Sequence, residues 1–168
     1  MKHLILMLSL CLGIGAVQAQ FHEKLQGKAF DLEANKVQQG ESFFLDGWYK
    51  GYIKLKSGEV LDGVSMRYDK LNDQLLYEEN GQYYSAGPSV VQFHIASDDA
   101  LYNFAKGYPK IGKFTDQSFY EVLHDGTTKL LKKHVTNLKS VKNEEGILEK
   151  MAEDTTQYYV IKDKKISL

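Results

Sequence analysis

Residues 74–86 have the sequence QLLYEENGQYYSA, in which two aromatic and aliphatic runs surround an Asn-Gly pair. Asn80 and Gly81 form the pair that two-residue type I′ turns favour, because both central residues must adopt positive φ. A turn at this position places Tyr77 opposite Tyr84. Aromatic pairs across antiparallel strands stabilise a sheet by roughly 0.2–1 kcal/mol. The segment therefore predicts an antiparallel β-hairpin.

Two further segments have the same arrangement of run, turn and run. In YIKLKSGEVL, residues 52–61, a turn at 57–58 places a charged side chain opposite one of the other charge and an apolar side chain opposite another apolar one. The expected pairs are Lys56 with Glu59 and Leu55 with Val60. In YYVIKDKKISL, residues 158–168, a turn at 163–164 ends the chain inside its sheet. The expected pairs there are Ile161 with Ile166 and Tyr159 with Leu168.

The segment FYEVLHDGTTKLLKKH, residues 119–134, predicts a fourth hairpin around an Asp-Gly pair. Two registers remain open for it. A two-residue loop pairs Tyr120 with Leu131 and Glu121 with Leu130, whereas a three-residue loop pairs Val122 with Leu130. In both registers each face carries apolar and charged residues, which indicates a hairpin that is neither fully buried nor fully exposed.

Other segments complete an all-β prediction. Residues 41–51, 63–68 and 89–95 have the composition or alternation of strands. Residues 20–41 fit neither the strand nor the helix period, and residues 143–155 predict one short helix capped by Asn143. We expect an antiparallel meander of hairpins, about eight to ten strands on the usual spacing of turns. It would form a sandwich, a curled sheet or a partly closed barrel, with at most one short helix.

The N-terminus predicts export. Residues 1–19 combine a short basic start, an apolar run and small residues at Val17 and Ala19, the pattern of a cleaved signal peptide. Cleavage after Ala19 leaves residues 20–168 as one exported domain, periplasmic or extracellular, without a transmembrane helix. The single cysteine, Cys11, follows a leucine and not a small residue, so we do not expect a lipoprotein.

Composition and motifs give little support for catalysis or nucleic-acid binding. The chain has 21 basic and 22 acidic residues, so no basic excess favours a nucleic-acid partner. It lacks G-x-S-x-G, G-x-G-x-x-G and Walker motifs, and its histidines lack metal-ligand spacing. The side chains expected to be surface or turn groups are His22, His94, His124, His134, Asp69, Asp73, Asp98 and Asp99. We therefore expect no catalytic residue, no metal and no cofactor.

Several quoted motifs carry a resemblance to a known family. They are MRYDKLNDQLLY at 66–77, FYEVL at 119–123, LLKK at 130–133 and YYVIKDKKISL at 158–168. With them, the chain from about Ser42 onward resembles a family of uncharacterised secreted β-rich proteins of the Bacteroidota. Asp69 stands where Asn is more usual in that family. The resemblance implies a small exported β domain and no particular activity.

Aromatic and basic side chains are the candidate binding residues. Adjacent residues of a strand face opposite ways, so each aromatic pair places one ring outward, where it can stack on a sugar or meet a protein. A run of lysines near residue 133 can meet an anionic surface, or it can be the solvated edge of a strand. The candidates are Trp48, Tyr49, Tyr52, Tyr83, Tyr84, Lys132 and Lys133.

These observations predict a non-enzymatic exported envelope protein that binds or scaffolds a protein or glycan partner. Two alternatives remain. One is a small-ligand carrier with a barrel-type cavity. The other is a hydrolase whose site lacks a recognisable motif.

Overall fold

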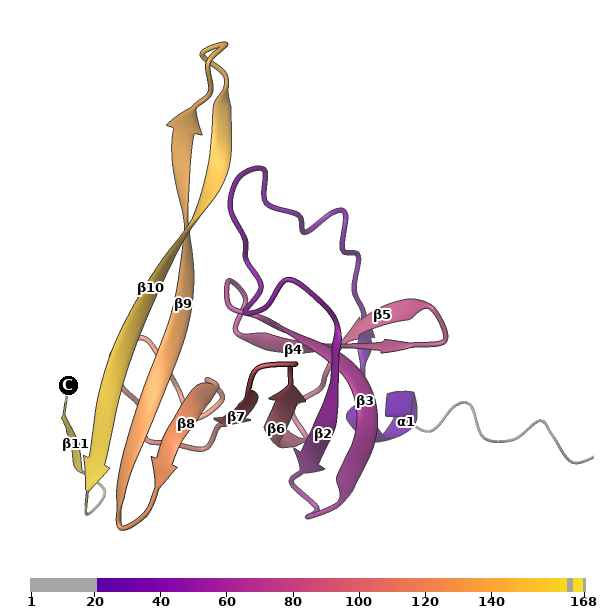
Figure 1. Ribbon diagram of the computed structural model, residues 1–168, viewed down its shortest axis with the longest axis vertical. Helices are drawn as coiled ribbons and strands as arrows, with labels where there is room; N and C mark the ends of the chain where they lie inside the picture. The colour runs from indigo at the N-terminus through magenta and orange to yellow at the C-terminus, as the bar shows by residue number, and fades with distance from the viewer. Residues whose placement is uncertain (1–20, 163–164, 168) are drawn as a thin grey trace, which may run out of the picture.

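The computed structural model describes residues 21–162 and 165–167, which form one sheet and one short helix (Figure 1). The elements are α1 (Phe21–Leu25), β1 (Lys28–Ala29), β2 (Tyr49–Leu55), β3 (Val60–Asp69), β4 (Gln74–Glu79), β5 (Gln82–Ser85), β6 (Val90–Ala96), β7 (Leu101–Ala105), β8 (Tyr120–Asp125), β9 (Thr128–Lys142), β10 (Leu148–Lys162) and β11 (Lys165–Ser167). The all-β class and the antiparallel hairpins are confirmed. The sheet is not closed and not strongly curled. The predicted signal segment lies outside the described residues.

Strand order follows the chain except at two places, where β1 pairs with β5 and β6 pairs with β2. The order is β1-β5-β4-β3-β2-β6-β7-β8-β9-β10-β11, and every paired strand is antiparallel to its neighbour. β6 returns to pair with β2, so that β1 and β3–β5 lie on one side of β2 and β6–β11 on the other. Turn signals concern strands that are adjacent in sequence, and they did not predict this pairing.

The pairings predicted at two hairpins are confirmed. Asn80 and Gly81 have φ angles of 55° and 74°, as a type I′ turn requires. The confirmed pairs are Tyr77 with Tyr84 and Ile161 with Ile166. The Tyr77 and Tyr84 rings are stacked with their centroids 5.3 Å apart. The turn predicted at residues 163–164 and the predicted partner of Tyr159, Leu168, lie outside the described residues.

The two pairs predicted beside the β2–β3 turn are wrong by one residue, whereas the same register holds from Tyr49 to Gly51, beyond a bulge. Lys54 is opposite Val60, and the Leu55 N–H donates to the carbonyl of Glu59 at 2.8 Å. The loop has three residues and ends in Gly58, whose φ is 92°. A glycine in the left-handed region at the third loop position is the usual way to close such a hairpin.

Both registers predicted for the β8–β9 hairpin are also wrong. Val122 is opposite Leu131, and Asp125 is opposite Lys129. The register shifts between Val122 and His124, as in a β-bulge. Because a bulge adds a residue to one strand alone, no choice of loop length could give the correct pairs along the whole hairpin.

The helix predicted at residues 143–155 is wrong, because these residues form the turn between β9 and β10 and the first half of β10. β9 and β10 pair in continuous register from Lys142 and Leu148 down to Thr128 and Lys162. The Asn143 side chain does accept backbone N–H groups, but within the hairpin turn. Gly146, with φ of 79°, permits that turn and disfavours a helix.

Buried side chains form two clusters that meet at the start of β8. The first lies over β2–β7 and includes Tyr68, Phe93, Phe104 and Phe119. The second lies over β8–β11 and includes Tyr120, Leu131, Tyr159 and Ile161. Burying each large side chain contributes roughly 1.5–3 kcal/mol. Phe119 and Tyr120 are adjacent yet belong to different clusters, because neighbouring residues of a strand face opposite ways.

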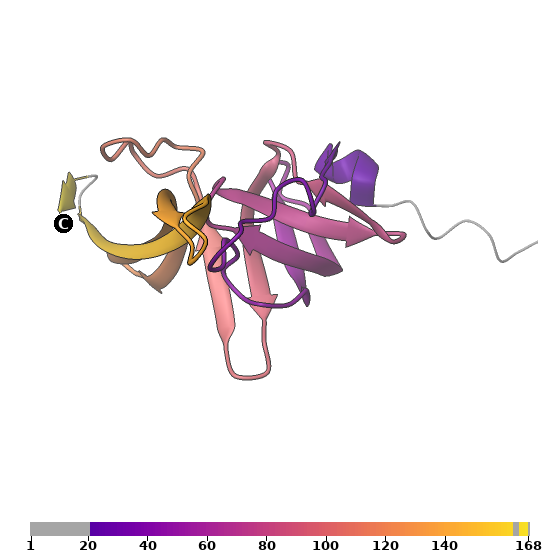
Figure 2. The ribbon, with the colours of Figure 1, turned by 90° about the horizontal axis from the view of Figure 1, so that it is seen from above.

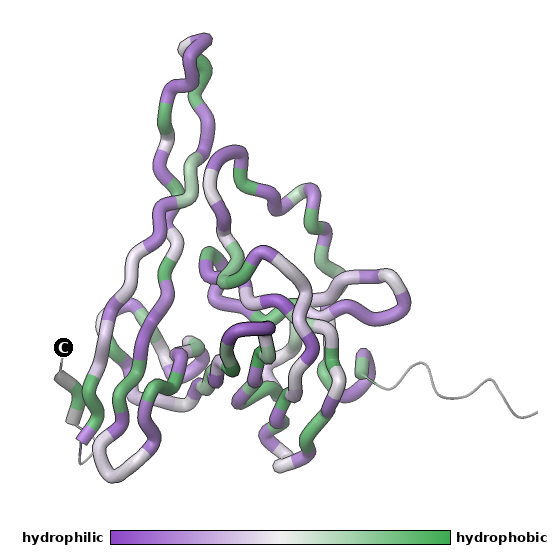
Figure 3. The backbone as a smooth tube through the Cα atoms, viewed as in Figure 1, coloured by the Kyte–Doolittle hydropathy of each residue, from purple (hydrophilic) through white to green (hydrophobic). Residues whose placement is uncertain are grey.

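The distal half of the β9–β10 hairpin rises beyond the rest of the sheet (Figure 1). Seen from above, the hairpin lies beside the β2–β7 region and not over it (Figure 2). Hydrophilic and hydrophobic residues alternate along it toward its tip (Figure 3). Residues 137–140 are exposed, and Leu148 is 65% exposed.

Candidate functional site

β9 is paired on both sides only near its start. It pairs with β10 along its whole length, but β8 pairs with it only from Lys129 to Lys132. Among the strands that the structure describes, β10 is the sole partner of residues 133–142. This stretch of β9 is consequently a free strand edge, which can template the addition of another strand.

The opposite edge of the hairpin is covered by the chain itself only in part, by residues 38–40 near Met151 and by β11 at Val160–Lys162. Residues 38–40, here named the strap, lie parallel to β10. The Gln39 N–H donates to the Lys150 carbonyl at 3.2 Å, and the Ala152 N–H donates to the Gln39 carbonyl at 2.8 Å. The Gln38 side-chain oxygen accepts from the Lys150 N–H at 2.7 Å. The strap thus occupies the position that an added strand would take.

The direction of the free backbone groups of β9 follows from the hairpin register. The Asn143 N–H donates to the Ile147 carbonyl at 2.9 Å, and the register continues unshifted into both strands. Antiparallel pairs alternate between hydrogen-bonded and non-hydrogen-bonded. The groups of Lys133, Val135 and Asn137 therefore bond to β10, and those of His134, Thr136 and Leu138 face away from it. Lys150, which contacts the strap on the other edge, fits the same alternation.

An open groove of about 460 Å³, here named the β9 groove, runs along this free edge. It is lined by residues 70–73 between β3 and β4, by Lys113, Phe114 and Ser118 between β7 and β8, and by residues 133–138 of β9. Consecutive residues of a strand point to opposite faces. A groove lined by six consecutive strand residues must therefore meet the strand along its edge.

A buried polar cluster of Tyr68, Asp73, Phe119 and Lys133 lies at the groove, here named the Asp73 cluster. The Lys133 side chain is only 1% exposed, and its Nζ lies 2.7 Å from Asp73 Oδ1. It also donates to the Phe119 carbonyl at 2.8 Å and to Tyr68 Oη at 3.2 Å. Asp73 Oδ1 accepts from the Tyr68 hydroxyl at 2.7 Å and from the Phe119 N–H at 3.2 Å. These contacts join β3, the β3–β4 turn, the residue before β8, and β9 at the boundary of the two core clusters.

Burial and charge act in opposite directions on this cluster. Burial lowers the pKa of Lys133, and the Asp73 carboxylate partly offsets that effect. Burial raises the pKa of Tyr68 well above its usual value, and Asp73 adds to the increase. The Lys133 ammonium also lies 5.3–5.9 Å from the ring centroids of Tyr68, Phe114 and Tyr120. Because the Lys133 ammonium hydrogen-bonds to groups of the fold, it holds the segments around the groove together and is not available to a ligand.

A second set of polar contacts lies on the other face of β9. His134 Nε2 donates to Glu121 Oε2 at 2.6 Å. Burial acts to raise the pKa of Glu121, but the hydrogen bond from His134 and the nearby charges lower it. Thr136 Oγ1 donates to Asp154 Oδ1 at 2.6 Å, and Lys70 forms an ion pair with the same carboxyl group. Lys70 thereby fixes the β3–β4 turn against the long hairpin.

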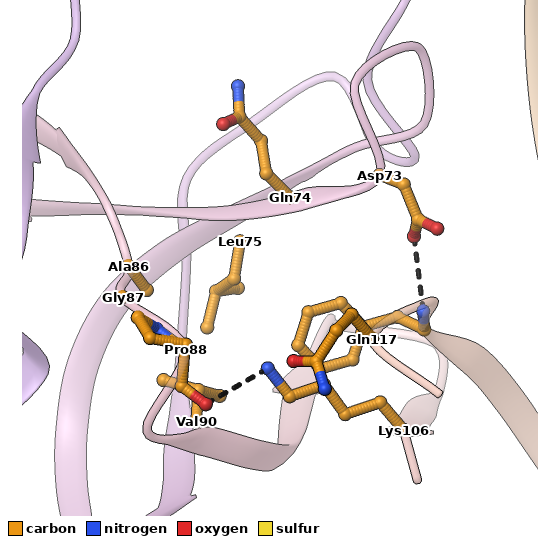
Figure 4. Close-up of a pocket in the computed structure, with 10 residues that line it drawn as sticks. Asp73, Gln74, Leu75, Ala86, Gly87, Pro88, Val90, Lys106 and Gln117 are labelled. Atoms are coloured by element: carbon orange, nitrogen blue, oxygen red, sulfur yellow. Dashed lines mark hydrogen bonds between the residues drawn. The ribbon is translucent and has the colours of Figure 1, made fainter. Parts of the chain in front are cut away.

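Asp73 also lines a smaller hollow of about 110 Å³ beside β4 and β6 (Figure 4). The Asp73 carboxylate accepts from the Phe119 N–H at 3.2 Å. In this view the Lys106 ammonium donates to the Pro88 carbonyl, at 3.2 Å. Burial lowers the pKa of Lys106. The hollow is too small for a peptide or sugar. Its contacts hold the segment before β8 in place.

The five predicted aromatic residues do not line the β9 groove, and each already has a partner. Trp48 stacks on Tyr83, with centroids 4.9 Å apart and ring planes at 18°. The remaining contacts are Tyr84 with Tyr77 and His22, Tyr52 with His94, and the Tyr49 hydroxyl with Asp46. Because rings stacked on one another have less surface for a sugar, these residues are weaker candidates than the sequence suggested.

Three further predictions change with the structure. Lys133 does line the β9 groove, but it is buried and so cannot belong to an anionic-surface patch. Lys132 lies 3.6 Å from the Glu121 carboxylate. His94, predicted at the surface, is only 8% exposed because Tyr52 covers it, and burial lowers its pKa. The turn role of Asp69 is confirmed by its hydrogen bonds from the residues that follow it.

Sequence reasoning missed most of the groove. Asp73 was predicted to be a turn acid, and Lys113 and Phe114 were not singled out. No motif marks these residues. Lys133 lies in the basic run KLLKKH at 129–134, so the sequence carried no signal that distinguishes it from a surface lysine.

Comparison with known protein families, curated proteins and solved structures gives no match for this chain. Within residues 21–162 and 165–167, no helix is long and apolar enough to cross a membrane. The same residues contain no group of three or more His, Cys, Asp or Glu side chains placed to hold a metal ion. The fold and the groove define an all-β protein with an open, walled strand edge.

Proposed function

We propose that this chain is a non-enzymatic binding module that takes an extended segment of a partner polypeptide along the free edge of β9. The observation that carries the proposal is the lining of the groove by six consecutive residues, 133–138, of a strand paired on one side only. A bound segment would continue the position that β8 leaves at Tyr120.

The backbone supplies the binding groups for such a segment. His134, Thr136 and Leu138 direct their N–H and C=O groups into the groove. Each backbone hydrogen bond contributes about 0.5–1.5 kcal/mol net, so a few of them give useful affinity without a specific sequence. A glycan offers no matching alternation of donors and acceptors, so the groove favours a polypeptide over a glycan partner.

The walls of the groove restrict what can be added. Besides β9, the walls are formed by residues 70–73, Lys113, Phe114 and Ser118. A bare strand edge invites sheet-to-sheet aggregation, and proteins commonly cover or charge such edges. On this proposal the walls leave room for one added strand and keep the edge of another sheet away from β9, so the edge can stay open without promoting aggregation. The strap provides a second support, because it shows an extended segment on the other edge of the same hairpin.

The location and class of the protein stay predictions. Export follows from residues 1–19 alone, and a partner polypeptide would then belong to the bacterial envelope. The resemblance to secreted β-rich proteins of the Bacteroidota and the expected lack of enzymatic activity also stay predictions. No feature of the groove specifically favours the carrier or the hydrolase alternative.

Amide hydrogen exchange tests the proposal directly. A displayed library of random peptides is selected on the purified chain, and exchange is measured by NMR with and without a selected peptide. In the free chain we expect fast exchange at His134, Thr136 and Leu138, and slow exchange at the intervening residues that bond to β10. The peptide should slow exchange at those three residues. Failure to select a peptide, or binding without this alternating protection, would overturn the proposal.

A matched pair of variants separates backbone from side-chain contributions. Proline is tolerated on a strand edge where its nitrogen faces outward. Leu138→Pro should therefore keep the fold, as measured by circular dichroism. It should weaken peptide binding by about tenfold more than Leu138→Ala does, because only the proline removes one backbone hydrogen bond. Equal weakening by both variants would contradict strand addition.

A further inference from the structure

The charged side chains that line the β9 groove are mostly positive. Lys70, Lys113 and Lys133 contribute three ammonium groups, and Asp73 contributes the only carboxylate among the lining residues. The chain as a whole is nearly neutral, with a net charge of −1. Because Asp73 and Asp154 pair with two of these lysines, the remaining positive charge of the groove is that of Lys113.

The three lysines are not equally available to a ligand. Lys133 is buried and paired with Asp73, and Lys70 is paired with Asp154 and only 8% exposed. Lys113 is exposed, and it belongs to none of the ion pairs formed within residues 21–162 and 165–167. Lys113 is consequently the cation of the groove that a ligand can reach.

The loop holds Lys113 in place. Ile111 and Phe114 exchange two backbone hydrogen bonds of 3.0 and 2.9 Å around the pair Gly112-Lys113. Gly112 has φ of 56°, as the first central residue of a type II′ turn requires. The Phe114 ring packs near the Lys133 ammonium at 5.3 Å and anchors the turn to β9. The ammonium of Lys113 is thus presented by a tight, anchored turn.

We infer that the polypeptide segment taken by the β9 groove is acidic, with a carboxylate that pairs with Lys113 and apolar side chains that contact Phe114 and Leu138. This inference rests on the proposed function and adds the chemistry of the partner. An exposed ion pair adds little affinity, but charge complementarity excludes basic segments, because like charges brought together are unfavourable.

Three synthetic peptides test the inference. They share one alternating apolar sequence of about six to eight residues, the length of a typical strand, and they carry Glu, Gln or Lys at the same variable positions. Affinities are measured by calorimetry at low and at physiological salt. We expect the Glu peptide to bind about fivefold more tightly than the Gln peptide at low salt, with a smaller difference at higher salt. The Lys peptide should bind most weakly.

Variants of the loop identify the responsible side chain. Lys113→Gln should abolish the preference for Glu over Gln, and Lys113→Glu should shift the preference to the Lys peptide. Lys110→Glu is the matched control, because Lys110 is exposed on the same loop but does not line the groove. It should leave the order of the three peptides unchanged.

The outcomes separate the two proposals. Equal binding of the three peptides, with protection at His134, Thr136 and Leu138, would overturn the acidic preference and leave strand addition in place. A preference for Glu that persists in Lys113→Gln would also overturn the inference. Binding of the Glu peptide without protection at those amides would overturn strand addition itself. No binding by any of the three, together with no peptide from the displayed library, would overturn both.

Discussion

The two edges of the β9–β10 hairpin differ in whether other parts of the chain hydrogen-bond to their backbone N–H and C=O groups. On β10, the strap covers the edge around Lys150 and Ala152 with hydrogen bonds from the chain itself. On β9, residues 133–138 face a groove whose walls leave room beside the strand. The same hairpin thus has a β10 edge that the chain closes around Lys150 and Ala152 and a β9 edge that faces a groove at residues 133–138, and this difference locates the candidate site.

The largest effect is expected where the open edge joins the core. Asp73→Ala removes the carboxylate that pairs with the buried Lys133. Leaving a buried charge without its partner costs about 3 kcal/mol or more of unfolding free energy. Urea denaturation should show a correspondingly lower midpoint.

Asp73→Asn sharpens this test. Its amide oxygen can still accept from the Tyr68 hydroxyl and the Phe119 N–H, but it carries no charge. It should destabilise the fold less than Asp73→Ala does. If Asp73→Ala were as stable as the unaltered chain, the Asp73 cluster would not be what holds the groove together.

The closed edge should respond to Gly40→Ala. Gly40 has φ of 81°, and an added Cβ would lie 2.8 Å from the Ala152 carbonyl oxygen. Strain of this kind costs about 1–2 kcal/mol, and release of the strap relieves it. We expect the Ala152 amide, which donates to Gln39, to exchange faster in NMR measurements.

Gly63→Ala is the matched control for the strap. Gly63 also has a positive φ, of 71°, but an added Cβ would meet no atom within 4 Å. It should lower overall stability slightly and leave exchange at Ala152 unchanged. A similar change at Ala152 in both variants would mean that the strap does not protect the β10 edge.

A smaller effect is expected from acid titration near the start of the free edge. The pKa of Glu121 is lowered in the folded chain, where His134 and Lys132 are its partners. The unfolded chain then binds more protons as the pH falls, so this stabilisation is present above about pH 4.3, the usual pKa of Glu, and is lost below it. Glu121→Gln should flatten the fall in urea midpoint between pH 5 and the folded pKa. An unchanged slope would show that other carboxylates determine the acid limb.

The smallest effect is expected at the tip of the hairpin. Leu148 is 65% exposed and lies beyond both the strap and the groove. Leu148→Thr should change the unfolding free energy by less than about 0.5 kcal/mol, as for most exposed positions. Thermal denaturation is sufficient to measure it. A larger loss would indicate that the tip packs against something in the folded protein.

Local sequence signals predicted the elements better than their partners. The Asn80-Gly81 turn was predicted correctly because its conformational requirement lies within two residues. The β8–β9 register was not, because a bulge depends on how the side chains pack in the assembled sheet. The helix at 143–155 was wrong because pairing with β9 satisfied the same backbone groups that a helix would have satisfied.

The amino-acid pattern by itself determined the class of the fold: strand-forming side chains in alternation, separated by residues that tolerate positive φ, commit the chain to antiparallel hairpins. The return of β6 to β2, the strap on β10 and the groove on β9 were decided only by tertiary structure. Each of them brings together segments far apart in sequence. Such contacts form because one arrangement buries the aromatic clusters and pairs Lys133 with Asp73, and no local rule carries that information.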